Sequence, residues 1–121
     1  MGVEELLQKL RTLLRDDDKV IWEDEELLCY LDLSLNLWNL YPPETEDTID
    51  QLRPSWSVPV LWGAVVNAVR ALQYNWVEGD DIPADRMAKY QELMDSAAGQ
   101  FLRLTDAKRR TVMLANGLGG N

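Results

Sequence analysis

The sequence predicts an all-α fold: a four-helix bundle with a long acidic, proline-containing loop between its second and third helices and an extended C-terminal arm. Two observations support this prediction. In four segments apolar residues recur at spacings of three and four, the period of a helix with a buried face. Between these segments stand prolines, glycines or acidic runs, which end helices. With 121 residues the chain suffices for one core, and we expect the bundle at residues 1–105 and a flexible arm at 106–121.

The first expected helix covers residues 3–14 and has a single apolar face. The residues on that face follow the helical spacing: Val3, Leu6, Leu7, Leu10, Leu13 and Leu14. Three consecutive aspartates at positions 16–18 then end the helix. We expect this helix to be a short lid on the bundle.

The second expected helix covers residues 24–40 and begins with an acidic turn. If Glu23 is the N-cap, Trp22 and Leu27 take the two positions of a hydrophobic staple. The acidic residues 24–26 then fill the first turn, where negative charge interacts favourably with the helix dipole. This role explains the acidic cluster better than a metal site does, because consecutive carboxylates point in different directions and the chain has no histidine.

This second helix has two apolar faces, whereas a small monomer needs only one. The first face consists of Leu27, Leu28, Leu31, Leu35 and Trp38. The second face consists of Tyr30, Leu33, Leu37 and Leu40. Either the helix is central and the bundle buries both faces, or one face is offered to a neighbouring molecule. The sequence leaves both options open, and the candidate subunit-interface residues are Tyr30, Leu33 and Leu37.

Residues 41–56 form the expected loop, which is long for a connection in a helical bundle and is therefore a candidate functional projection. The third helix, residues 58–78, is the most apolar segment and the expected centre of the core. Polar residues within it, such as Asn67 and Arg70, argue against a membrane span. Small residues on its flanks permit another helix to approach closely: Gly63, Ala64 and Ala71.

The fourth expected helix covers residues 84–105 and completes the core. We expect one shared cluster of buried side chains: Leu31, Leu35, Val65, Val69, Leu72, Met94 and Phe101. After residue 105 the apolar pattern decays into a basic stretch, a short apolar patch and several glycines. The candidate binding residues of this arm are Lys108, Arg109, Arg110, Val112, Met113 and Leu114.

The charge of the chain and the types of residue that it contains argue against several functions. The net charge is −9, and residues 1–50 hold fourteen acidic against four basic residues, which argues against sequence-specific DNA binding. The single cysteine, Cys29, excludes an internal disulfide and is expected to be a small buried residue. Without histidine, a cysteine–imidazole pair or a glycine-rich phosphate loop, the sequence predicts no enzyme, cofactor or metal.

Residues 22–42, W-E-D-E-E-L-L-C-Y-L-D-L-S-L-N-L-W-N-L-Y-P, follow a short amphipathic helix and precede an apolar helix and an amphipathic helix with a basic tail. This pattern resembles the head-to-tail connector, or adaptor, proteins of tailed bacteriophages. Such proteins commonly show a tryptophan, a small polar cap, two acids and a leucine pair at the start of the second helix. The resemblance covers roughly residues 3–110 and is sharpest at 22–31; Glu23 departs from it, because serine or threonine is commoner there.

The resemblance implies a structural virion protein that is assembled in the host bacterial cytoplasm and located at the head–tail junction. It implies a ring, usually dodecameric, that binds the portal protein above and a neck or tail protein below. The second face of helix 24–40 would make the lateral contacts and the arm would bind the portal. DNA would pass through the channel without specific binding, because an acidic surface repels its phosphates.

Two alternatives stay open. The first is a small acidic helical regulatory or interaction module, such as a phage-encoded inhibitor or a DNA mimic, whose acidic half occupies the nucleic-acid groove of another protein. That class predicts a compact monomer or dimer with a basic partner. The second alternative is another neck or tail-completion subunit of the virion.

Overall fold

The computed structural model describes the backbone of residues 2–42, 44–76 and 82–120, and their side chains except at 109 and 111–120. Four α-helices pack together: α1 (Val3–Leu14), α2 (Asp24–Leu40), α3 (Ser57–Asn75) and α4 (Ala84–Gly120), with a short 3-10 helix, η1 (Pro54–Trp56), before α3. Within these residues there is no β-strand. The prediction of an all-α fold with a long loop between the second and third helices is therefore confirmed.

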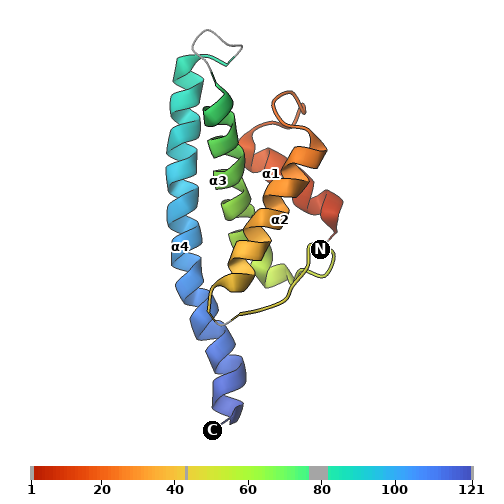
Figure 1. The fold of residues 1–121 in the computed structure, drawn as a ribbon, viewed down its shortest axis with the longest axis vertical. Helices are drawn as coiled ribbons and strands as arrows, with labels where there is room; N and C mark the ends of the chain where they lie inside the picture. Colours follow the sequence, from red (N-terminus) through yellow and green to blue (C-terminus); the bar gives the residue numbers. More distant parts are fainter. Residues whose placement is uncertain (1, 43, 77–81, 121) are drawn as a thin grey trace.

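Helix α3 lies at the centre of the bundle (Figure 1). Helices α2 and α4 pack along α3. Helix α1 passes behind α2 in this view and covers part of α3 (Figure 1). Helix α4 is much longer than its neighbours, and its C-terminal part projects past the rest of the bundle (Figure 1). In the described part of the chain, no helix is both long and apolar enough to cross a lipid bilayer.

One hydrophobic cluster joins all four helices. Of the seven core residues expected from sequence, five are buried in it: Leu31, Leu35, Val65, Val69 and Phe101. The other two, Leu72 and Met94, are half-buried and pack against the cluster. Trp22 and Leu27 are both buried there, as a hydrophobic staple requires. The backbone N–H of the N-cap Glu23 donates to Oε1 of Glu26 at 3.1 Å, which fixes the start of α2 where the sequence predicted it.

The loop between α1 and α2 is organised around the buried carboxylate of Asp16. That carboxylate accepts hydrogen bonds of 3.0 to 3.1 Å from three successive backbone N–H groups, those of residues 20–22. It also accepts a bond of 3.1 Å from the buried guanidinium of Arg11, which reaches Asp24 at the start of α2 as well. The bond from Arg11 lowers the pKa of Asp24. The first aspartate of the acidic run is thus an internal structural group.

The connector of residues 41–56 runs across one end of the bundle (Figure 1). Asn39 at the end of α2 donates a bond of 2.8 Å to the main-chain oxygen of Asp47. Arg53 makes two bonds to the Asp47 carboxylate, at 2.8 and 3.0 Å, and its guanidinium stacks 3.5 Å from the ring centroid of Trp56. Burial alone would raise the pKa of Asp47, but the bonds from Arg53 lower it. These contacts hold the connector against the bundle rather than in a free projection, and its functional role stays a prediction.

Helix α4 does not end near residue 105, where the sequence predicted an arm to begin, but continues to Gly120. Residues 106–120 contain no proline, and as far as residue 115 their lysine, arginines, alanines and leucine favour a helix, whereas three glycines follow. The decay of the apolar pattern marks the point where α4 leaves the bundle rather than the point where it stops (Figure 1).

Candidate subunit interface

The two apolar faces of α2 have different environments. The first face packs into the core, with four of its five residues buried and Leu28 half-buried. The second face points outward: the exposed fractions are 53% for Leu33, 49% for Leu37 and 66% for Leu40. Tyr30 is half-buried. The single chain therefore leaves a line of leucines along α2 in contact with solvent.

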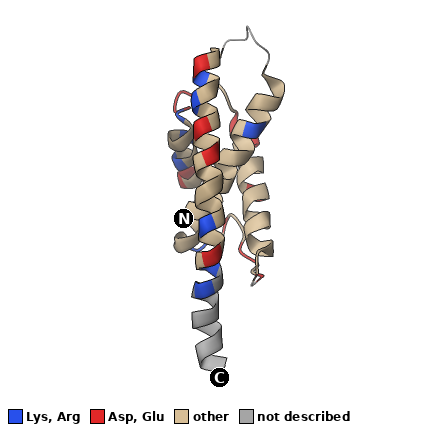
Figure 2. Cartoon of the chain, turned by 90° about the vertical axis from the view of Figure 1, so that its left-hand side faces the viewer, with Lys and Arg blue, Asp and Glu red and all other residues tan. Residues whose placement is uncertain are grey.

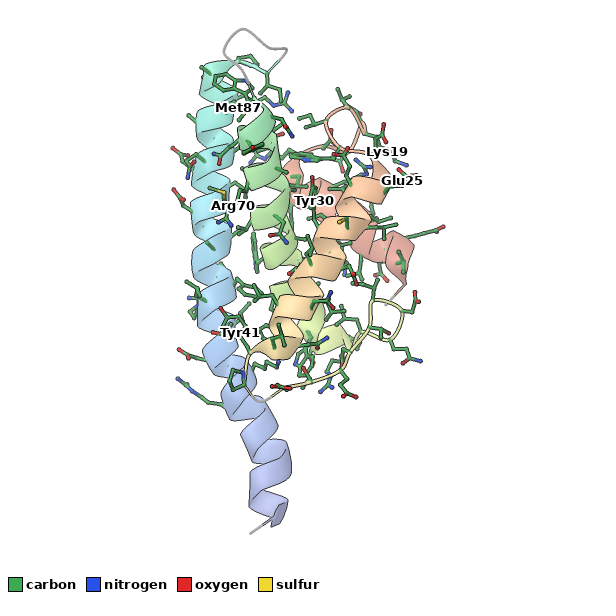
Figure 3. The ribbon with its side chains drawn as sticks, in the orientation of Figure 1. Lys19, Glu25, Tyr30, Tyr41, Arg70 and Met87 are labelled. Carbon is green, nitrogen blue, oxygen red and sulfur yellow. The ribbon has the colours of Figure 1, made fainter. Side chains whose placement is uncertain are left out.

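The upper part of this line borders a shallow groove between α2 and α3. We call this surface the α2–α3 face, and it consists of Tyr30, Leu33, Asn67, Arg70, Ala71, Tyr74 and Asn75. Asn67 donates a bond of 3.2 Å to the main-chain oxygen of Tyr30, which ties the two helices together here. Figure 3 labels Tyr30 and Arg70, which come from the two helices that form the face. Tyr74 is 90% exposed, so a large aromatic side chain stands free at one end of the face.

Two acidic residues of α2 lie near this face. Glu26 lies one turn before Tyr30, and the exposed Asp32 precedes Leu33 in the chain. Burial and the negative charge of Glu26 raise the pKa of Tyr30. Cys29 is exposed, which corrects the expectation that it is buried. The reason is its position, one turn before Leu33 on the outward side of the helix.

A second groove, about 1050 Å³ in volume, lies between α1 and the N-terminal half of α4. We call it the α1–α4 groove, and its lining consists of Thr12, Leu13, Arg15, Pro83, Asp85, Arg86, Lys89, Tyr90, Glu92 and Leu93. The guanidinium of Arg86 lies 5.8 Å from the ring centroid of Tyr90. Acidic and basic residues both occur along α4 (Figure 2). The groove thus combines a partly apolar floor with three basic and two acidic side chains.

The structure places Lys108 in the bundle rather than in an arm. Its side chain is buried, and its ammonium donates to the main-chain oxygens of Trp38 and, at 3.0 Å, of Tyr41. The ammonium also lies 5.1 Å from the ring of Trp38 and 5.4 Å from that of Trp56. Burial and the nearby charge of Arg53 lower the pKa of Lys108. Lys108 supplies the cation that the last turn of α2 lacks in its own sequence.

The other arm residues expected from sequence lie on the projecting part of α4. Arg110 is exposed. The side chains of Arg109, Val112, Met113 and Leu114 lie outside the described residues. The structure thus separates Lys108 from the other members of the predicted arm and does not bring the arm near the face formed by Tyr30 and Leu33.

Sequence patterns did not reveal two parts of the site. Tyr74 lies in the last turn of α3 and outside the apolar stripe of that helix. An aromatic residue in such a position could have indicated a contact surface. The α1–α4 groove joins residues about seventy positions apart, and no sequence pattern indicates that they meet. Both surfaces are suited to binding a protein, because each combines apolar side chains with a border of charge.

Comparison of the chain with models of known protein families, with curated proteins and with solved structures found no match. In the described part of the chain, no group of three or more cysteine or acidic side chains is placed to hold a metal ion.

Proposed function

We propose that this protein is a structural subunit of a phage virion, which forms an adaptor ring beneath the portal at the head–tail junction and extends the DNA channel toward the tail. The observation that carries the proposal is the outward apolar face of α2. Leu33, Leu37 and Leu40 stand exposed in line, although four of the five apolar residues on the opposite side of the same helix are buried. Full burial of a fully exposed leucine contributes about 1.5–3 kcal/mol. Because these side chains are only about half to two-thirds exposed, covering the rest against a neighbour would contribute roughly half of that for each leucine, and a row of them favours lateral assembly.

The projecting end of α4 supports the second part of the proposal, binding to the portal. It extends beyond the bundle as a helix (Figure 1), and Arg110 within α4 is exposed. A basic segment followed by an apolar patch suits a partner surface with an acidic border. In this proposal the arm consists of Arg109, Arg110, Val112, Met113 and Leu114, while Lys108 holds α4 to α2. A neck or tail protein binds below the ring, and the DNA passes through without specific contacts.

The alternative, an acidic inhibitor or DNA mimic, has less support. A mimic must display its carboxylates in an array that replaces phosphates. Here Asp16 is buried, and Asp24 and Asp47 are each bonded to an arginine of the same chain. Several carboxylates of the acidic half therefore stabilise the fold rather than form a free surface.

The test of the proposal is assembly. Sedimentation velocity and negative-stain electron microscopy of the protein, alone and mixed with the portal protein of the same phage, should show a closed ring that docks on the portal. The double variant Leu33→Lys/Leu37→Lys should keep the melting temperature and lose the ring, because both side chains are exposed in the single chain.

The matched control is Leu102→Lys, an equally exposed leucine on the outer side of α4, which should keep the ring. A double variant that still forms rings would show that this face is not the contact. A double variant that unfolds would show that the face is internal.

A further inference from the structure

We infer that the lateral contact is head-to-tail: the α2–α3 face of one copy binds in the α1–α4 groove of the next copy. This inference deepens the proposed function and rests on it, because it names the two surfaces that meet. A ring requires two different surfaces on each copy, each complementary to the other, whereas a two-fold dimer uses one surface twice.

The two surfaces lie on different sides of the bundle but at the same level along it. In Figure 1, α2 lies toward the viewer and α1 passes behind it, while α3 lies beside both helices, on the side of α4. Helices α3 and α4 run antiparallel, so that the last turns of α3, which carry Tyr74, lie beside the first turns of α4, which line the groove (Figure 1). The hydrogen bond from the Gln73 side chain on α3 to the Gln91 side chain on α4 shows that these parts of the two helices lie at the same height. A neighbour can therefore be placed beside the first copy without a shift along the bundle axis.

The apolar parts of the two surfaces match. Tyr74 stands free at one end of the α2–α3 face, and the exposed Leu33 belongs to the same face. The α1–α4 groove presents half-buried Leu13 and Leu93 together with Pro83. An exposed aromatic side chain that enters a groove with an apolar floor is the usual anchor of a protein interface. The arginines of the groove would further favour a tyrosine ring through cation–π contact.

The charges of the two surfaces match as well. The α2 side of the face carries Glu26 and Asp32, whereas the groove carries three bases, Arg15, Arg86 and Lys89. Arg70 on the α3 side can pair with Asp85 or Glu92 of the groove. If two α2–α3 faces met each other instead, acids would be brought toward acids, which disfavours a two-fold dimer.

The native cysteine provides a direct test of which surfaces meet. Cys29 is exposed beside the α2–α3 face, and Lys89→Cys places a second thiol in the α1–α4 groove. A short bismaleimide, which forms one C–S bond with each thiol, should join Cys29 of one copy to position 89 of the next. Because every copy carries both thiols on different surfaces, the product on a denaturing gel should be a ladder of multimers up to the ring.

Two controls are needed to interpret the ladder. The wild-type protein, with Cys29 alone, should give no ladder. Leu102→Cys places the second thiol about 20 Å further along α4, outside the groove, and should also give none. A ring without a ladder in the Lys89→Cys variant would overturn the head-to-tail inference and leave the proposed function intact. Wild-type dimers cross-linked through Cys29 would overturn the head-to-tail inference in favour of a two-fold contact. If the wild-type protein forms no ring, the proposed function fails and the head-to-tail inference fails with it.

A charge exchange tests the same contact without cross-linking. Asp32→Lys and Lys89→Glu should each weaken assembly about tenfold, because each places like charges across the contact. The double variant in one chain should regain most of this loss, since every contact then pairs the new lysine at position 32 of one copy with the new glutamate at position 89 of the next. Losses that simply add in the double variant would overturn the pairing of these surfaces.

Discussion

Gly63 on α3 lies so close to Ser34 on α2 that a Cβ added to it would be 2.1 Å from the Ser34 hydroxyl oxygen. That hydroxyl cannot move freely, because it donates a bond of 2.8 Å to the main-chain oxygen of Val60. We expect Gly63→Ala to lower the free energy of unfolding by about 1–3 kcal/mol, the usual cost of overpacking. Urea denaturation would measure it.

Gly99 on α4 is the matched control for this prediction. It is exposed, and no heavy atom lies within 4 Å of its added Cβ. Gly99→Ala should raise the free energy of unfolding by up to about 1 kcal/mol, because alanine favours a helix over glycine. Equal effects of the two substitutions would contradict the close packing of α2 on α3.

Lys108→Met should lower the free energy of unfolding by about 1–3 kcal/mol, because the main-chain oxygens of Trp38 and Tyr41 lose their buried donor. Lys89→Met, at an exposed position of the same helix, should change it by less than about 0.5 kcal/mol. Thermal and urea unfolding of the two variants would measure the difference. A neutral Lys108→Met would show that the bundle does not depend on this contact.

The contribution of Lys108 should also depend on pH. Its pKa is lowered by burial in the folded chain from an ordinary value of 10.5. Between the lowered pKa and 10.5 the unfolded chain binds more protons at this lysine than the folded chain does. The contribution of Lys108 to the free energy of unfolding therefore rises with pH in this range and reaches its full value above 10.5. The stability difference between wild type and Lys108→Met should therefore grow as pH rises toward 10.5. A difference that shrinks over this range would contradict the lowered pKa.

Asp16→Asn should lower the free energy of unfolding by about 3 kcal/mol, because it removes the charge that pairs with buried Arg11 and turns a donor toward backbone N–H groups. Asp18→Asn, in the same acidic run but exposed, should change it by less than about 0.5 kcal/mol. Chemical denaturation of the pair would measure the contrast. Equal effects would mean that Asp16 does not organise the loop.

Two truncations separate the fold from the arm. A chain that ends after Thr105 loses Lys108 and should be less stable than the full chain by about 1–3 kcal/mol. A chain that ends after Arg110 keeps this contact and should melt like the full chain, yet bind the portal more weakly because it lacks Val112, Met113 and Leu114. Portal binding by the second truncation at full strength would show that these residues are not the anchor.

Sequence patterns predicted the helices well because each carries its own signals. The bounds of α1 and α2 agree with prediction, since a staple at Trp22 and Leu27 and the acidic first turn fix the start of α2. Contacts between distant residues could not be predicted in the same way. Lys108 stands in a basic run that normally faces solvent, and only the approach of α4 to the end of α2 gives it partners. The α1–α4 groove depends likewise on how helices meet.

The length of α4 has a mechanical consequence. At 1.5 Å per residue its 37 residues span about 55 Å, with no proline to act as a hinge. One end lines the groove proposed to receive a neighbour, and the other projects toward the proposed site of the portal. A tilt imposed at the projecting tip would therefore be transmitted as rigid-body rotation to the lateral contact, and from there to the next copy. Such a rod would make the subunits of a ring respond to docking together rather than one by one.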